Sequence, residues 1–125
     1  MSKGREQIAA DVFFALGDRT RLSVVRKLGA GGARSATVLS DGAGVTRQAI
    51  VKHLQVLEGA GLVTHQKHGR EVLYSLEPRR LEEARAFLHA VSAGWDRAIE
   101  RLRRLVEEPS LPAVKRKRPI ARRGR

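Results

Sequence analysis

A polar helix followed at once by a basic hairpin is the pattern in residues 45–76 that most constrains the fold. This stretch reads VTRQAIVKHLQVLEGAGLVTHQKHGREVLYSL. Ile50, Leu54 and Leu57 recur at helical spacing and form one core-facing stripe. A Gly-Ala-Gly segment ends the helix, and two β-prone runs, LVTHQ and EVLYSL, follow it, joined by a basic turn at 67–70. This order of elements predicts a mainly helical winged helix-turn-helix with a small β-hairpin.

The opposite side of this helix carries polar and basic side chains that suit a DNA groove. Thr46 is a good N-cap, because its hydroxyl can accept a backbone N–H of the first turn. Arginine and glutamine pair with guanine and adenine edges, valine can touch a thymine methyl, and lysine meets phosphates. The alternative is a solvated helix face, and the basic hairpin weighs against it. The candidate DNA-binding residues are Thr46, Arg47, Gln48, Val51, Lys52 and Gln55 on the helix and Lys67, His68 and Arg70 in the hairpin.

The charge of the chain favours a polyanionic partner. There are 25 Lys and Arg against 13 Asp and Glu, which gives a formal net charge of +12. A membrane surface or an acidic protein would also be attracted, so charge alone does not name the partner. Cysteine is absent, which excludes disulfides, thiolate metal sites and thiol catalysis. Because no apolar run can span a bilayer and no signal-peptide core is visible, we expect a soluble, cytoplasmic protein.

The remaining segments predict a single domain over residues 1–108 and a disordered basic tail over 109–125. Helices are expected at 6–16 and 19–28, the second capped by Asp18 and carrying Leu22, Val25 and Leu28 as its apolar stripe. A glycine-rich break from Gly29 to Gly32 separates it from a short helix capped by Ser35, and Pro78 opens a long helix that ends near Glu108. The tail holds seven Lys or Arg and three Pro, so it cannot bury a core.

The last helix predicts a homodimer. Its apolar residues step by threes and fours, with one step of seven, over a length that a domain of this size cannot cover by itself. The alternative is that the helix folds back on its own domain. The first helix also has apolar surface to spare. The expected dimer interface contains Val12, Phe13, Leu88, Val91, Trp95, Ile99, Leu102 and Val106.

Residues 12–107 resemble the ArsR family of bacterial winged-helix repressors. The resemblance implies a homodimer, joined through the first and last helices, that binds an inverted-repeat operator and represses transcription. Its motifs together cover about three quarters of the chain. The matching segments are ALGDRTRL at 15–22, VTRQAIVKHLQVL at 45–57, AGLV at 60–63 and Gly69-Arg70 leading to Leu73-Tyr74.

Many ArsR-family members release DNA when they bind a metal, but this sequence lacks the ligands. The family's thiolate run on the helix before the recognition helix is occupied here by Ser35, Ala36, Thr37 and Val38, and hydroxyls are poor ligands for soft metals. The family's second site, on the last helix, is matched only by His89, Asp96 and Glu100, without a second histidine. We therefore expect no metal and no cofactor, and no residue identifies an inducer.

The expected roles of His53 and His65 differ. His53 flanks the core stripe, where packing or hydrogen bonding is favoured over a phosphate contact. His65 is a strand residue of undetermined facing, and Tyr74 is expected to pack in the core or the hairpin. No combination of His, Ser and acidic residues has the spacing of a catalytic site, so we expect no enzyme activity.

The sequence thus favours a regulator that binds duplex DNA. A competing hypothesis is a winged helix that docks on a protein, although such a face should carry more exposed apolar or aromatic residues. A third is a sequence-neutral coat on nucleic acid, which would favour exposed aromatic residues for stacking. The chain has only one Trp, one Tyr and three Phe, placed mostly in predicted core or dimer positions.

Overall fold

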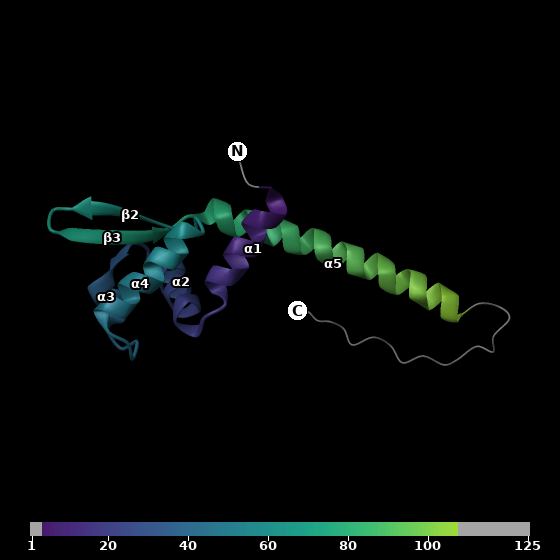
Figure 1. Ribbon diagram of the computed structural model, residues 1–125, viewed down its shortest axis with the longest axis horizontal. Coiled ribbons are helices and arrows are strands. Elements are labelled where there is room, and N and C mark those ends of the chain that lie inside the picture. Colours follow the sequence, from purple (N-terminus) through teal and green to yellow (C-terminus); the bar gives the residue numbers. More distant parts are fainter. Residues whose placement is uncertain (1–3, 108–125) are drawn as a thin grey trace. The chain divides into compact units, whose positions relative to one another are not determined.

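The computed structural model describes residues 4–107, so the predicted tail at 109–125 lies outside the described residues. The described part is mainly helical, with a small antiparallel sheet (Figure 1). Its contacts divide the chain into a unit that ends at His89 and a second unit that begins at Ala90. The elements are α1 (Arg5–Leu16), α2 (Arg19–Gly31), β1 (Arg34–Ser35), α3 (Ala36–Ser40), α4 (Arg47–Gly59), β2 (Val63–His68), β3 (Glu71–Leu76) and α5 (Pro78–Val106).

The predicted helix starts are confirmed at atomic detail. The Asp18 carboxylate accepts the backbone N–H of Arg21 at 3.0 Å and caps α2. The Ser35 hydroxyl accepts the N–H of Val38 at 3.2 Å and caps the short α3. The Thr46 hydroxyl accepts the N–H of Ala49 at 3.0 Å and caps α4. Each cap supplies an acceptor to a backbone donor that has no partner within its own helix.

Helix α2 is longer than predicted. The glycine-rich stretch was expected to break the chain from Gly29, yet α2 continues to Gly31 and is capped by Gly32, whose φ is +84°. Glycine lowers helix propensity by only about 1 kcal/mol, which packing can offset. A Cβ on Gly29 would lie 3.4 Å from the Leu76 side chain, so the glycine permits a close approach of α2 to β3.

The sheet has the strand order β1-β3-β2, with both pairs antiparallel. In the hairpin, Val63 pairs with Leu76 and His68 pairs with Glu71, which leaves a two-residue turn. The four-residue basic turn expected from Lys67 was therefore wrong, because Lys67 and His68 are the last residues of β2. Gly69 has a φ of +64°, a conformation that glycine adopts without a side-chain clash. Strand β1 was not predicted.

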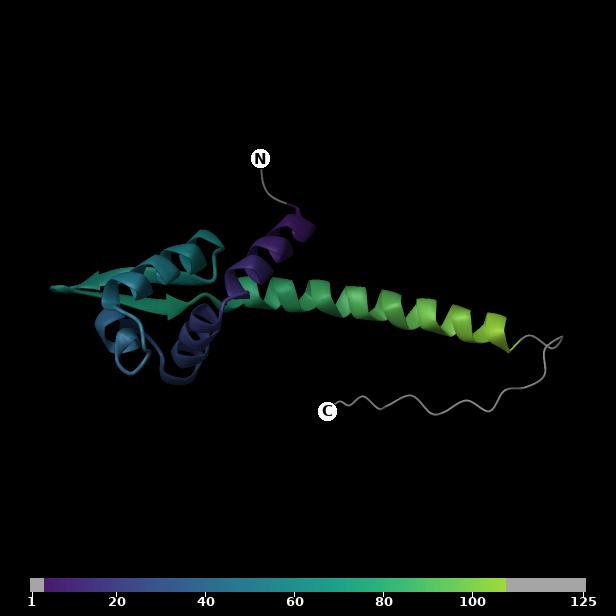
Figure 2. The ribbon, with the colours of Figure 1, turned by 60° about the horizontal axis from the view of Figure 1, so that its bottom comes forward.

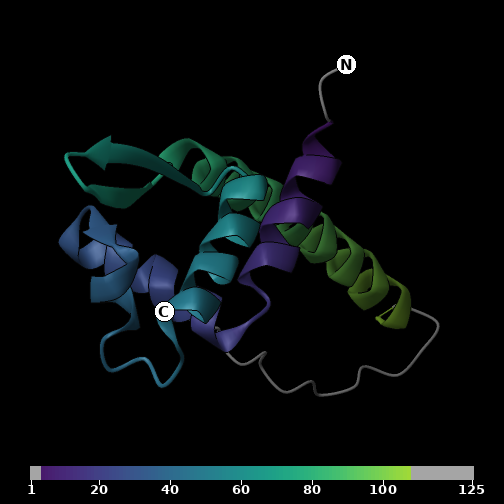
Figure 3. The same cartoon turned by 60° about the vertical axis from the view of Figure 1, so that its left-hand side comes forward.

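The core of the first unit joins α1, α2, α3, α4 and the sheet. Figures 2 and 3 show α1 beside α4, and the two helices are in contact. Two sequence-based predictions were wrong. Val12 is fully buried in the core of its own protomer, so it is not available to a second copy, and Leu22 is 50% exposed while Val24 takes its place. The largest fully buried side chains are Leu39, Ile50, Leu54, Leu57, Leu62, Val12, Val24 and Val63.

Candidate nucleic-acid interface

Helix α4 separates its core-facing stripe from an exposed polar arc, as predicted. Ile50, Leu54 and Leu57 are buried and anchor the helix. The side chain of Val51 is half-buried and packs against the core, so only part of it faces solvent. The exposed residues on the predicted DNA-binding side are Thr46, Arg47, Gln48, Lys52 and Gln55. A rigid, buried stripe therefore fixes the direction in which the polar side chains project.

Helices α3 and α4 form the helix-turn-helix pair. They pack against each other, and the loop between them contains Gly42 and Gly44, both at positive φ. At the start of α4, the Nε atom of Arg47 donates a hydrogen bond to the Thr37 hydroxyl of α3 at 3.2 Å. This bond ties the first residue of the predicted recognition helix to the preceding helix.

The β2–β3 hairpin forms the wing. Its candidate residues Lys67, His68 and Arg70 are all exposed, at the end of the hairpin distant from its connections to α4 and α5. In Figures 1 to 3 the tip of the hairpin and α3 lie at the same end of this unit. The structure therefore brings the basic hairpin and the helix-turn-helix pair to one side, as a winged helix requires.

A contact that sequence reasoning missed joins the wing to α4. The Nδ1 atom of His65 on β2 lies 2.6 Å from Oε2 of Glu58, near the end of α4. The His65 ring also packs against Tyr74 of β3, with ring centroids 5.7 Å apart. Because the partners come from three elements, no local pattern could reveal the contact. It links the wing to the recognition helix.

His53 has the predicted hydrogen-bonding role. Its Nδ1 atom lies 3.2 Å from Nη1 of Arg21 and 3.8 Å from the Asp18 carboxylate. Arg21 also donates from Nε to the Ala15 carbonyl at 2.6 Å, which connects the group to α1. The backbone N–H of Arg21 holds the pKa of the Asp18 carboxyl below its usual value, and nearby positive charge adds to this effect. The cluster joins α4 to the start of α2.

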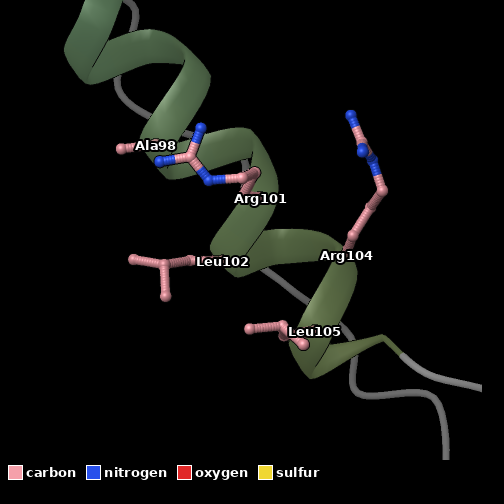
Figure 4. Close-up of a pocket in the computed structure, with 5 residues that line it drawn as sticks. All are labelled: Ala98, Arg101, Leu102, Arg104 and Leu105. Carbon is pink, nitrogen blue, oxygen red and sulfur yellow. The ribbon is translucent and has the colours of Figure 1, made fainter.

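The apolar side chains of α5 are largely exposed in the single chain. Trp95 is 66% exposed and Leu102 is 61% exposed. Figure 4 shows Ala98, Leu102 and Leu105 pointing to the same side of the helix, with Arg104 pointing away from them. These residues, together with Arg101, line a hollow of about 560 Å³. Monomeric proteins rarely leave apolar patches of this kind uncovered.

Comparison with known proteins agrees with this geometry. A family model described as a helix-turn-helix domain matches residues 16–66. A transcriptional regulator of Bacillus subtilis is 39% identical, with 54% of this chain and 82% of the relative covered. An ArsR-like regulator of Rhodococcus is 36% identical in its solved structure, with a TM-score of 0.73 and coverage of 82% of this chain and 96% of that one. The chain belongs to the ArsR family.

Two further similar proteins come from mycobacteria. The repressor SmtB of Mycobacterium tuberculosis is 34% identical, with 73% of this chain and 65% of the repressor covered. A homodimeric winged helix-turn-helix domain from Mycobacterium bovis shares the fold at 23% identity, with a TM-score of 0.55 over 80% of this chain and 93% of that one. This ArsR-family chain is a DNA-binding transcriptional regulator with a winged helix-turn-helix fold, and its family is not one of enzymes.

The family's metal-binding positions carry no clustered ligands within residues 4–107. In this range no group of three or more His, Cys, Asp or Glu residues is placed to hold a metal ion. His89, Asp96 and Glu100 are each exposed on α5. None of the described helices is both long enough and apolar enough to cross a bilayer.

Proposed function

We propose that two copies of this ArsR-family chain bind one inverted-repeat operator and repress transcription there. The observation that carries the proposal is the exposed polar arc of α4 beside the basic wing, both held on one buried core. Two such helices, linked by two-fold symmetry, fit half-sites about one helical turn apart. The repressor SmtB supports the sign of regulation, and the homodimeric domain from Mycobacterium bovis supports the assembly.

The residues of the DNA interface divide into two roles. Gln48 and Gln55 are exposed on α4, where their amides can pair with adenine edges in the major groove. Val51 can add a methyl contact through the part of its side chain that stays exposed. Arg47, at the start of α4, can pair with a guanine edge. The remaining residues hold the complex on its phosphates without reading sequence, and these are Thr46, Lys52, Lys67, His68 and Arg70.

The proposed dimer interface consists of the apolar face of α5 and the exposed phenylalanines of α1. Burying this face against a second copy would remove apolar surface from water in both chains. On α1, Phe13 is 36% exposed and Phe14 is 71% exposed, whereas Val12 is buried in the protomer core. The proposed interface residues are Phe13, Phe14, Leu88, Val91, Trp95, Ile99, Leu102 and Val106.

Footprinting on the region upstream of the protein's own gene tests the proposal. We expect protection of two related half-sites with their centres about 10 base pairs apart, or a multiple of that spacing. A reporter placed behind the protected site should be expressed less when the protein is present. Protection of a single half-site would contradict the dimer, and higher reporter expression would contradict repression.

A further inference from the structure

A small cavity lies between the helix-turn-helix pair and the wing. Its volume is about 190 Å³, which is below the range of about 300–1,000 Å³ typical of sites for drug-sized ligands. The cavity therefore suits a single small ion or group. It is lined by Ser35, Ala36, Thr37, Arg47, Arg70, Glu71, Val72 and Tyr74.

The lining favours an anion. Two arginines from different elements line it, Arg47 from the first turn of α4 and Arg70 from the turn of the wing. Three residues that carry hydroxyl groups, Ser35, Thr37 and Tyr74, are also among the lining residues. A single carboxylate, that of Glu71, opposes the two positive charges.

Arg47 is held in place for such a ligand. Its hydrogen bond to Thr37 uses Nε and not the two terminal nitrogens, which can form a fork toward an anion. Guanidinium groups bind phosphate oxygens with two parallel hydrogen bonds, a geometry that a lysine cannot match. We propose that the cavity is a site for one phosphate-type oxyanion, shared by Arg47 and Arg70.

In the DNA complex, the occupant is a backbone phosphate. This part of the inference rests on the proposed function. A helix in the major groove and a wing in the neighbouring minor groove lie on either side of one phosphate strand. Arg47 of that helix and Arg70 of that wing both line the cavity. Free inorganic phosphate has the same chemistry and is the second source of the ligand.

The inference changes the expected role of Arg47. Sequence reasoning placed Arg47 among residues that pair with base edges, because arginine is the residue type that most often contacts guanine. A shared phosphate makes its contribution independent of base sequence. Arg47 would then act with Arg70 and not with its helix neighbour Gln48.

Salt dependence of DNA binding tests the shared phosphate. The variants are Arg47→Ala, Arg70→Ala and the double variant, with Arg85→Ala as the control that removes one guanidinium outside the cavity. Each cavity variant should weaken operator and random duplex by the same factor. If both arginines share one phosphate, the double variant should lower the slope of log K against log salt by about 1, whereas two separate phosphates would lower it by about 2.

Removing the charge of Glu71 should change DNA affinity in the opposite direction. Glu71→Gln removes the only acidic side chain among the lining residues and should tighten binding to both duplexes. Because Arg47, Arg70 and Glu71 are all exposed, these substitutions should leave folding intact, which circular dichroism can check. Weaker binding by Glu71→Gln, or a double variant that loses a slope of about 2, would overturn the shared site.

Titration with inorganic phosphate in the absence of DNA separates the two sources. Two-dimensional NMR of the full chain, at constant ionic strength with sodium chloride as the control salt, should show saturable shifts at the cavity that the Arg47→Ala, Arg70→Ala double variant lacks. Saturable binding with unchanged DNA slopes would overturn the backbone-phosphate assignment and leave a free oxyanion as the ligand. Unchanged slopes with no saturable shifts would overturn the site. Failure of the unmodified protein to prefer any duplex would refute the proposed function, and the phosphate titration would still decide the cavity.

Discussion

Truncation of Trp95 tests whether the apolar face of α5 joins two copies of the chain. The side chain is 66% exposed in the single chain, so most of its surface is available to a partner. A tryptophan buries up to about 250 Å², and covering two thirds of that at about 25 cal/mol per Å² is worth about 4 kcal/mol per copy. A partner covers only part of each ring, so each copy contributes less than this maximum. We therefore expect the two copies together to contribute about 4 kcal/mol to dimer stability.

A loss of about 4 kcal/mol corresponds to an increase of about 10³-fold in the dimer dissociation constant. Sedimentation equilibrium of Trp95→Ala over a range of concentrations measures this constant directly. Arg97→Ala, also exposed on α5, is the matched control and should leave the constant unchanged. Alanine is a better helix former than tryptophan, so loss of helix is not an explanation for dissociation.

Operator binding should fall together with dimerisation. A monomer loses the gain from two linked half-sites, even though its recognition helix is intact. Binding of Trp95→Ala should therefore recover at protein concentrations high enough to restore the dimer. If Trp95→Ala dimerises as tightly as Arg97→Ala does, the apolar face of α5 is not the interface and the reasoning fails.

Four further predictions follow from the interface, the metal positions, the tail and the cap of α2. Gln48→Ala should cost roughly 1–3 kcal/mol of binding free energy on the operator and relax base preference, whereas Lys67→Ala should weaken binding to all duplexes alike. If each variant lost equal affinity for the operator and for random duplex, these roles would be contradicted. Zinc, cadmium or arsenite should leave operator binding unchanged in a gel-shift titration, because hydroxyls replace thiolates; release of DNA would reveal a missed site. Truncation after residue 108 should preserve operator preference but flatten the salt dependence of binding to random duplex, and an unaltered slope would make the tail irrelevant. The pKa of Asp18 is lowered in the folded protein, so its carboxylate stabilises the fold at pH values above its ordinary pKa and loses this effect as the pH falls through the lowered pKa. In urea unfolding, acid should therefore destabilise Asp18→Asn less than the unmodified protein. Equal acid sensitivity of the two proteins would refute the assignment.

Local patterns were sufficient to predict most helices and their starts. The caps at Asp18, Ser35 and Thr46 were readable because a cap is a contact between residues three apart. The core stripe of α4 was readable because helical periodicity places Ile50 and Leu54 on one face. Such signals lie within a single element, so the rest of the fold is not needed to interpret them.

Other features depended on contacts between distant segments. Strand β1 has only two residues, and it exists because the free edge of β3 pairs with Arg34 and Ser35. The spacing of α2 allowed either Leu22 or Val24 to face inward, and packing against the other helices buried Val24. On α1, helical periodicity placed Val12 on an apolar face. It did not reveal whether the core of the same protomer or a second copy would cover that face.

The candidate DNA interface could be predicted only in part, because it combines local patterns with contacts between distant segments. Exposure of the arc followed from helical periodicity, and the hairpin was predicted from its β-prone runs and basic turn. The contacts that hold both in place come from separate elements. The Arg47–Thr37 and His65–Glu58 contacts join residues ten and seven positions apart across a loop. Sequence spacing alone gives no reason to pair them.

Three polar contacts join the recognition helix to α3, α2 and the wing. Near its start Thr37 of α3 binds Arg47, in the middle Arg21 of α2 contacts His53, and near its end Glu58 contacts His65 of the wing. Side chains fixed before binding lose less conformational freedom when DNA arrives, so more of the contact energy appears as affinity. The buried stripe sets which way α4 faces, and the contact between Glu58 and His65 links the end of α4 to the wing. We therefore expect DNA binding to depend on these supporting side chains as well as on the exposed arc of α4.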